Sequence, residues 1–206
     1  MDYTENYISH INNGLKQSIC KSKGVEENLN TFLNSMVSLT ELCQNSNGRI
    51  FFVGNGASAA FCNHMALDWS KNGGINSVSL SDSAFLTALA NDYSYESAFS
   101  EFLKINDCNE KDLVVTVSSS GNSSNIVSVL NFCKENNIPS IGFSGLKPEN
   151  ISTQLAKYSL YVPVKTYGMA ECIHQVFLHM WLDKFMEIYE WDRDEVQNMN
   201  IKDFKL

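Results

Sequence analysis

An excess of positive charge is what this sequence most clearly lacks. Its 206 residues include 15 Lys and Arg against 23 Asp and Glu, which leaves a formal net charge of −8. A broad basic surface is therefore excluded, and with it nucleic acid and anionic membranes as expected partners. A small anionic ligand is not excluded, because hydroxyls and backbone N–H groups can build a local phosphate site.

Long apolar runs, paired cysteines and internal divisions are also missing. No stretch of 18 apolar residues occurs, and the first residues lack the apolar core of a signal peptide, so we expect a cytoplasmic protein without a membrane span. The 6 cysteines include no C-x-x-C pair, which predicts reduced thiols packed in the fold. No repeat, linker or low-complexity segment divides the chain, so we expect a single domain over residues 1–206.

The apolar pattern predicts alternating strands and helices. Helical spacing of apolar residues covers 2–22, 25–45, 58–71, 82–92, 94–105, 122–136 and 169–190. Short apolar runs typical of buried parallel strands cover 49–54, 76–80, 112–117, 139–145 and 158–164. This alternation predicts an α/β fold, a doubly wound, five-stranded parallel sheet with helices on both faces. The helices within residues 1–45 are expected to pack on the α/β unit, and a polar tail closes the chain.

A serine-rich stretch, VSSSGNSSN at residues 117–125, lies between a predicted strand and a predicted helix. In a parallel sheet such loops collect at the carboxyl ends of strands, where ligands bind. Free N–H groups at the helix start attract an anion, serine hydroxyls add donors, and Gly121 permits a close backbone approach. The alternative is a polar loop with a serine N-cap, and composition alone does not separate the two. The lysine of a nucleotide-binding P-loop is absent.

A second glycine loop, GNGAS at residues 54–58, follows the first predicted parallel strand and begins the next helix. A single G-x-G is a weak indication because it often occurs by chance. Two such loops after two parallel strands, facing the same side of the sheet, are a much stronger one. Together they predict a site for a phosphate group, and a sugar phosphate is the preferred ligand.

Four segments, FFVGNGASAA, LSDSAFLTALANDYSYESAFS, DLVVTVSSSGNSSNIVSVL and IPSIGFSG, resemble the sugar isomerase (SIS) domain family. Within that family they look most like the phosphoheptose isomerases of bacterial heptose synthesis, and the resemblance covers nearly the whole chain. It implies an aldose–ketose isomerase that converts sedoheptulose 7-phosphate to D-glycero-D-manno-heptose 7-phosphate through an enediol. It also implies a homotetramer that serves lipopolysaccharide or capsule synthesis. The alternative is a non-catalytic SIS module that senses a sugar phosphate or binds a protein partner.

The same resemblance implies the site residues. The metal ligands, for Zn²⁺ or another divalent ion, would be His64, Asp68, Glu171 and His179. Asp68 and His179 would also be the catalytic acid–base pair. The substrate-binding positions would be Asn55, Gly56, Ala57, Asp68, Asn91, Asp92, Ser118, Ser119, Ser120, Ser123 and Glu171. Two histidines and two carboxylates are a ligand set that suits Zn²⁺.

Without the resemblance, the residues leave two questions open. His64 and Asp68 are four apart and share one helical face, although a packed histidine and a solvated aspartate are the simpler interpretation. Glu171 is closer to His174, three residues on, than to His179, which lies about 12 Å of helical rise away. The pattern therefore favours His174 and the resemblance favours His179; we follow the resemblance.

Several positions depart from the phosphoheptose isomerase pattern. Asp68 stands where the family has glutamate, one methylene longer, which can displace a proton-transfer group by about 1 Å. Glu171 stands where the family has glutamine. The segments YGMA and DWSKNGG both lack an arginine that the family usually has, which removes positive charge near an anionic sugar phosphate. Lys71 is the nearest candidate to compensate.

Overall fold

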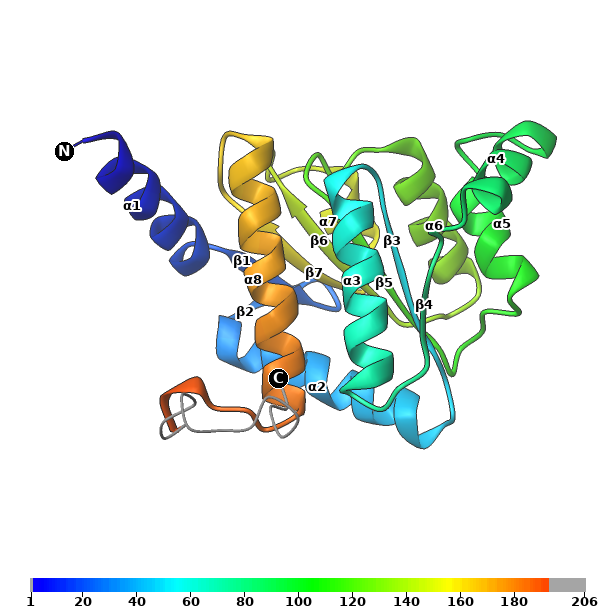
Figure 1. The fold of residues 1–206 in the computed structure, drawn as a ribbon, viewed down its shortest axis with the longest axis horizontal. Helices are drawn as coiled ribbons and strands as arrows, with labels where there is room; N and C mark the ends of the chain where they lie inside the picture. Colours follow the sequence, from blue (N-terminus) through cyan, green and yellow to red (C-terminus); the bar gives the residue numbers. More distant parts are fainter. Residues whose placement is uncertain (1, 193–206) are drawn as a thin grey trace.

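The computed structural model describes residues 2–192 and shows a sheet between two layers of helices (Figure 1). Five parallel strands form most of this sheet: β3 (Ile50–Gly54), β4 (Ser77–Ser79), β5 (Leu113–Ser118), β6 (Ser140–Gly145) and β7 (Tyr158–Val162). They lie in the order β4-β3-β5-β6-β7, which confirms the predicted doubly wound parallel sheet. The chain proceeds outward from β3 in one direction and from β5 in the other. The loops after these two neighbours therefore diverge at one switch point.

Two further strands extend the sheet beyond β7, so it has seven strands instead of the five predicted. Helix α1 is Tyr3–Lys16, and the prediction of a helix over residues 2–22 is wrong beyond Lys16. Strands β1 (Ile19–Ser22) and β2 (Val25–Glu27) form an antiparallel hairpin, and β1 pairs with β7. Lys23 and Gly24 turn the hairpin with φ of 52° and 82°, as in a type I′ turn. The strand β1 forms because the edge of β7 has backbone N–H and C=O groups with which it can pair. The apolar spacing of residues 2–22 does not reveal such a partner.

Helices cover both faces of the sheet, and each face has its own apolar core. One face carries α2 (Leu29–Asn45), α3 (Ala57–Lys71) and α8 (Tyr167–Phe185). The other carries α4 (Ser83–Asp92), α5 (Ala98–Ile105), α6 (Ser124–Glu135) and α7 (Ile151–Leu155). Neighbouring residues of β3 point to opposite cores, Phe52 to the first and Phe51 to the second. In Figure 1, α3 and α8 stand side by side in front of the sheet.

Helix α1 is attached to the rest of the molecule at one end. Gly14 lets it approach α8, because an added Cβ there would lie 2.5 Å from Ile173 Cδ1. Its first turns extend away from the sheet (Figure 1), where Tyr3 and Ile8 are exposed. Helix α2, in contrast, contributes buried side chains to the core.

Other boundaries differ from the prediction by a few residues. Helix α2 begins at Leu29 and α5 at Ala98, and α8 ends at Phe185 instead of 190, before a short 3-10 helix, Glu190–Asp192. The sequence pattern does not predict α7. The predicted polar tail, residues 193–206, lies outside the described residues.

The expectations about thiols and membrane spans can be compared with residues 2–192. Five of the 6 cysteines are buried, Cys172 is exposed, and all are free thiols. Every helix in this part of the chain is too short or too polar to cross a bilayer.

Candidate functional site

The serine-rich stretch forms the loop from the end of β5 to the start of α6, with Ser123 as the N-cap residue. Gly121 makes this turn with φ of +63°, a conformation that is costly for residues with a side chain. A Cβ at this position would also lie 2.1 Å from Asn150 Oδ1. The Gly145 N–H donates to the Ser119 carbonyl oxygen at 3.0 Å, which fastens the loop to β6. The loop is therefore held in one conformation at the carboxyl end of β5.

The serine hydroxyls of this loop keep donors for a ligand. Ser118 Oγ and Ser120 Oγ accept backbone N–H groups of the same loop at 3.2 and 3.3 Å. Each of them retains its own O–H, because a hydroxyl can accept and donate at once. Ser119 Oγ is buried without a hydrogen-bond partner among the described residues, and the Ser123 side chain does not cap α6. Four hydroxyls thus lie beside the N-terminus of a helix, with that of Ser119 buried beneath the surface, and such an arrangement suits an anion.

The second glycine loop joins β3 to α3 and is tied to the serine-rich loop through side-chain amides. Asn55 and Asn125 form a reciprocal pair in which each amide nitrogen donates to the other's oxygen, at 2.9 and 3.0 Å. Tyr95 Oη donates to the same Asn55 oxygen at 2.8 Å. Gly56 precedes α3 with φ of 56°, and Ala57 is the first helical residue. The two loops predicted to share a site are therefore adjacent.

Two predicted substrate-binding residues lie apart from these loops. Asn91 and Asp92 end α4, both are exposed, and Asn91 Nδ2 donates to Asp92 Oδ1 at 3.0 Å. Neither makes a hydrogen bond to the two loops within residues 2–192, so their contact with substrate stays a prediction. The turn after α4 instead brings Tyr95 to Asn55. Sequence reasoning missed Tyr95, and it also missed Asn125, although the latter closes the serine-rich stretch.

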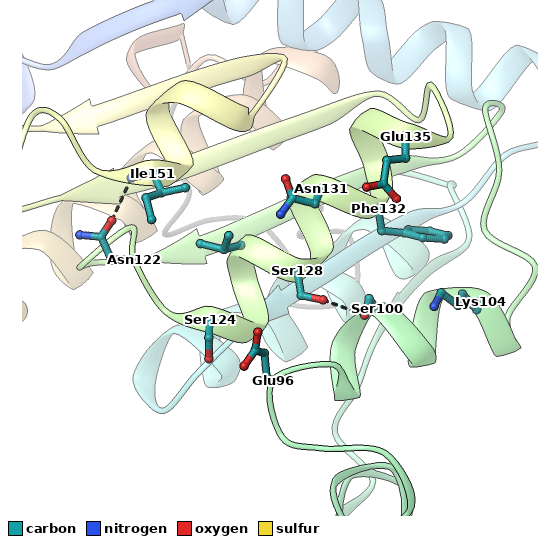
Figure 2. A pocket seen from close by; sticks show the side chains of 11 residues that line it. Glu96, Ser100, Lys104, Asn122, Ser124, Ser128, Asn131, Phe132, Glu135 and Ile151 are labelled. Atoms are coloured by element: carbon teal, nitrogen blue, oxygen red, sulfur yellow. Dashed lines mark hydrogen bonds between the residues drawn. The ribbon is translucent and has the colours of Figure 1, made fainter.

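A surface cavity of about 460 Å³ lies between α5 and α6, beside the serine-rich loop (Figure 2). The carboxylates of Glu96 and Glu135 line it together with Lys104. Lys104 Nζ is already paired with Glu101, at 2.7 Å. The carboxylates of Glu96 and Glu135 repel an anion, and the charge of Lys104 is neutralised by Glu101. This cavity is therefore poorly suited to a sugar phosphate. The junction of the two loops is the better phosphate site.

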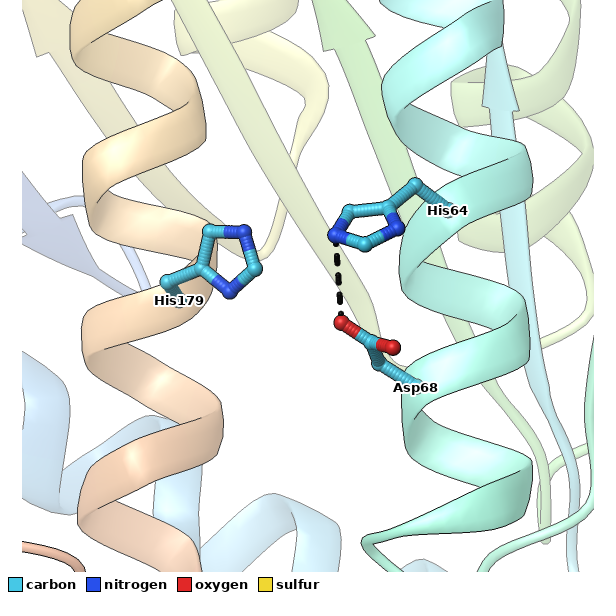
Figure 3. A group of neighbouring side chains, drawn as sticks. All are labelled: His64, Asp68 and His179. Atoms are coloured by element: carbon cyan, nitrogen blue, oxygen red, sulfur yellow. Dashed lines mark ion pairs between the residues drawn. The ribbon is translucent and has the colours of Figure 1, made fainter. Parts of the chain in front are cut away.

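Three of the four ionisable residues predicted on α3 and α8 come together in one group (Figure 3). Ligand atoms of His64, Asp68 and His179 all lie within 4.8 Å of one another. His64 and Asp68 are one turn apart on α3, with His64 Nε2 3.2 Å from Asp68 Oδ2. His179 projects from α8, its ring centroid 5.2 Å from that of His64. The contact of Trp69 with Trp181, centroids 4.5 Å apart, packs the two helices together and sets this separation.

Asp68 is the buried member of the group, with its side chain 8% exposed. Its Oδ2 is near enough to His64 to count as an ion pair, but the geometry is not that of a hydrogen bond. The oxygen therefore has no hydrogen-bond donor among the described residues. A buried carboxylate oxygen in this state is costly, and a bound cation would satisfy it.

Two imidazoles and a carboxylate are donors that Zn²⁺ prefers, so the residues fit a divalent ion. Bonds of about 2.0–2.2 Å place tetrahedral ligand atoms about 3.4 Å apart. The three side chains would therefore approach one another by rotation to hold it.

The structure brings His179, and not His174, to His64 and Asp68. His174 is fully buried, its Nε2 lies 3.0 Å from the Ser144 carbonyl oxygen, and burial lowers the pKa of His174 to about 4. A neutral imidazole bonded to a backbone carbonyl does not exchange protons at neutral pH. Glu171, half-buried on α8, is outside the described His–Asp–His group, so its roles as ligand and substrate contact stay predictions.

One residue beside the group was missed from the sequence. Gln175 lies one turn before His179, and its amide Nε2 is 2.7 Å from His179 Nε2 and 3.9 Å from Met65 Sδ. The Gln175 Oε1 atom is buried and has no partner within residues 2–192. The spacing of four residues was the available signal, but such pairs are also common on solvated helices.

Comparison with known proteins adds to this geometry. The chain matches the model of the SIS domain over residues 15–145. It is 35% identical to a phosphoheptose isomerase of Aneurinibacillus thermoaerophilus over 186 residues, which cover 87% of this chain and 90% of the relative. It is 34% identical to phosphoheptose isomerase 2 of Campylobacter jejuni, with 77% and 82% covered.

A solved phosphoheptose isomerase from Neisseria gonorrhoeae has the same fold. It aligns with a TM-score of 0.76 at 25% identity, over 89% of this chain and 95% of that chain. The predicted resemblance is therefore confirmed. All three relatives are named as isomerases, which favours the predicted enzyme over the non-catalytic alternative.

Proposed function

Because this chain belongs to the SIS domain family and, within it, to the phosphoheptose isomerases, we propose that it isomerises sedoheptulose 7-phosphate to D-glycero-D-manno-heptose 7-phosphate. The observation that carries this proposal is the His64–Asp68–His179 group on α3 and α8, since α3 begins at the glycine loop. His64 follows Ala57 by seven residues, about 10 Å along the helix. A phosphate held at the loops thus leaves the carbonyl end of an extended sugar within reach of the ionisable group.

The phosphate is bound in this proposal without arginine or lysine. The hydroxyls of Ser118, Ser119, Ser120 and Ser123 donate to its oxygens, and the N-terminus of α6 adds backbone N–H groups and its dipole. Asn55 stands where the two loops meet, held by Asn125, so its amide is placed to orient a sugar hydroxyl. Neutral donors of this kind would take the place of the arginines that the family usually has and that this chain lacks.

The isomerisation moves a proton between neighbouring carbons. A base takes the proton from the carbon next to the carbonyl while the carbonyl oxygen is protonated, which gives an enediol. Protonation of the former carbonyl carbon and loss of the hydroxyl proton on its neighbour then give the aldose. We assign the base to Asp68, whose buried Oδ2 has no hydrogen-bond donor in the described part of the chain. We assign the acid to His179, whose ring faces the same space.

His64, Asp68 and His179 are also proposed to hold Zn²⁺ or a similar divalent ion. When bound, such an ion supplies a Lewis acid for the carbonyl oxygen. Its remaining position would be open to water or to an oxygen of the sugar. Glu171 as a further ligand is the least supported part of this set, because about 12 Å of helical rise separates it from His179.

A homotetramer in the cytoplasm completes the proposal. Exposed apolar side chains support association: Tyr3 and Ile8 on the projecting helix α1 are 81% and 63% exposed, and Leu67 on α3 is 59% exposed. Exposed apolar side chains on surface helices are common at subunit interfaces. A monomer mass by light scattering at micromolar concentration would contradict this part of the proposal.

The direct test incubates the purified protein with sedoheptulose 7-phosphate and follows the aldose product by NMR. The double substitution Ser118→Ala and Ser120→Ala should raise KM for the phosphorylated sugar at least tenfold, because two donors to the phosphate are lost. Ser128→Ala, on the wall of the cavity in Figure 2, is the matched control and should leave KM unchanged. An unchanged KM in the double variant would show that this loop does not bind the phosphate.

The metal is tested by elemental analysis. His64→Ala should lose both bound metal and activity, whereas His10→Ala, on the exposed side of α1, should lose neither. Metal-free protein with full turnover would show that Asp68 and His179 act without an ion.

A further inference from the structure

The contact between Gln175 and His179 determines which ring nitrogen of His179 carries the proton. The two nitrogens of this pair, one in the amide and one in the ring, are 2.7 Å apart. An amide nitrogen only donates, so His179 Nε2 accepts in this arrangement. A neutral imidazole carries a single N–H, which therefore lies on Nδ1.

The other orientation of the amide reverses this assignment. A half-turn about the last side-chain torsion of Gln175 exchanges Oε1, which is now buried and unpartnered within residues 2–192, with the amide nitrogen. The oxygen then accepts a hydrogen bond from Nε2–H of His179, and Nδ1 carries a lone pair. One orientation thus presents a proton at Nδ1, and the other presents a metal ligand or a base.

We propose that Gln175 is a positioning residue: it holds His179 Nε2 and so makes Nδ1 the atom that ligates the ion or transfers the proton. Figure 3 shows Nδ1 of His179 turned toward Asp68 on the neighbouring helix. Metal-bound histidines generally donate their second ring N–H to an acceptor, which fixes the tautomer and the ring orientation, and Oε1 of the turned Gln175 amide would be such an acceptor. The inference rests on the proposed role of His179, and it concerns a residue outside the predicted site residues.

The tautomer can be read without metal, substrate or turnover. In metal-free protein labelled with ¹⁵N-histidine, long-range ¹H–¹⁵N spectra distinguish Nδ1–H from Nε2–H. The wild type should show Nδ1–H at His179. Gln175→Glu, whose carboxylate only accepts, should convert it to Nε2–H, and Gln175→Leu should give a mixture. Val176→Thr, on the exposed adjacent position of α8, is the matched control and should keep the wild-type tautomer.

Affinity and kinetics provide the second readout. Gln175→Leu should weaken binding of Zn²⁺ alone by about 10–100-fold in calorimetry, the usual loss when the partner of a ligating histidine is removed. Gln175→Glu should restore that affinity. In turnover, Gln175→Leu should lower kcat and leave KM nearly unchanged, because the described contacts of the Gln175 side chain are with His179 and Met65 and not with the serine hydroxyls. A circular dichroism spectrum identical to the wild type confirms that the fold is intact.

The same His179 tautomer in all variants, or unchanged Zn²⁺ affinity in Gln175→Leu, would overturn the proposal. Failure of the proposed function gives a different pattern. If His64→Ala retains full isomerase activity, the His–Asp–His group is not catalytic, yet the tautomer of His179 would still follow residue 175.

Discussion

The buried imidazole of His174 makes the stability of this protein depend on pH. Burial lowers the pKa of His174 from its ordinary value of 6.5 to about 4, although the bond to the Ser144 carbonyl opposes the shift. At pH between these two values the unfolded chain binds a proton that the folded chain does not. The free energy of unfolding therefore falls as the pH drops through this window, and it is fully retained above pH 6.5.

The magnitude follows from the two pKa values. The difference between 6.5 and about 4 corresponds to about 3 kcal/mol of stability, all of it lost below the lower value. At pH 5 about 2 kcal/mol of this is already gone relative to pH 7.5. His174 is fully buried, so solvent screening does not reduce the effect.

Urea unfolding of metal-free protein at pH 7.5 and pH 5.0 measures the effect. His174→Gln keeps a donor for the Ser144 carbonyl but cannot titrate, so its loss of stability between the two pH values should be about 2 kcal/mol smaller than in the wild type. His10→Gln, at an exposed position on α1, should behave as the wild type. Carboxylates contribute equally to all three proteins and cancel in the comparison. Equal losses in the wild type and His174→Gln would refute the reasoning.

Three further predictions concern the loops. Gly121→Ala should cost about 1–3 kcal/mol in urea unfolding, because φ is +63° and the new Cβ would lie 2.1 Å from Asn150 Oδ1; a neutral effect would mean that the loop relaxes freely. Tyr95→Phe removes the 2.8 Å bond to Asn55 at an exposed position, so stability should change by less than about 0.5 kcal/mol while KM rises severalfold. Ser123→Ala should also raise KM and change stability by less than about 0.5 kcal/mol, since this side chain does not cap α6; a loss near 1 kcal/mol would identify it as a cap.

Much of the parallel sheet is predictable from local sequence. Strands such as β3 and β5 are buried on both faces, so they are largely apolar and end in loops rich in glycine and serine. The hairpin of residues 19–27 is not predictable in the same way. Its first strand is stabilised by pairing with β7, which lies far away in the chain, and its short, partly exposed strands carry no apolar run.

The site, like the fold, is only partly predictable from the sequence. The sequence alone places His64 and Asp68 on one helical face, because residues four apart lie one above the other. The tertiary structure determines which histidine of α8 joins them. His174 and His179 are five residues apart, so they point about 140° from each other around the helix. The packing of α8 directs His174 into the core and leaves His179 at the seam with α3, and it sets Gln175 against the His179 ring. Helical periodicity fixes relative directions on one helix, but only packing against the sheet and α3 chooses which direction becomes the site.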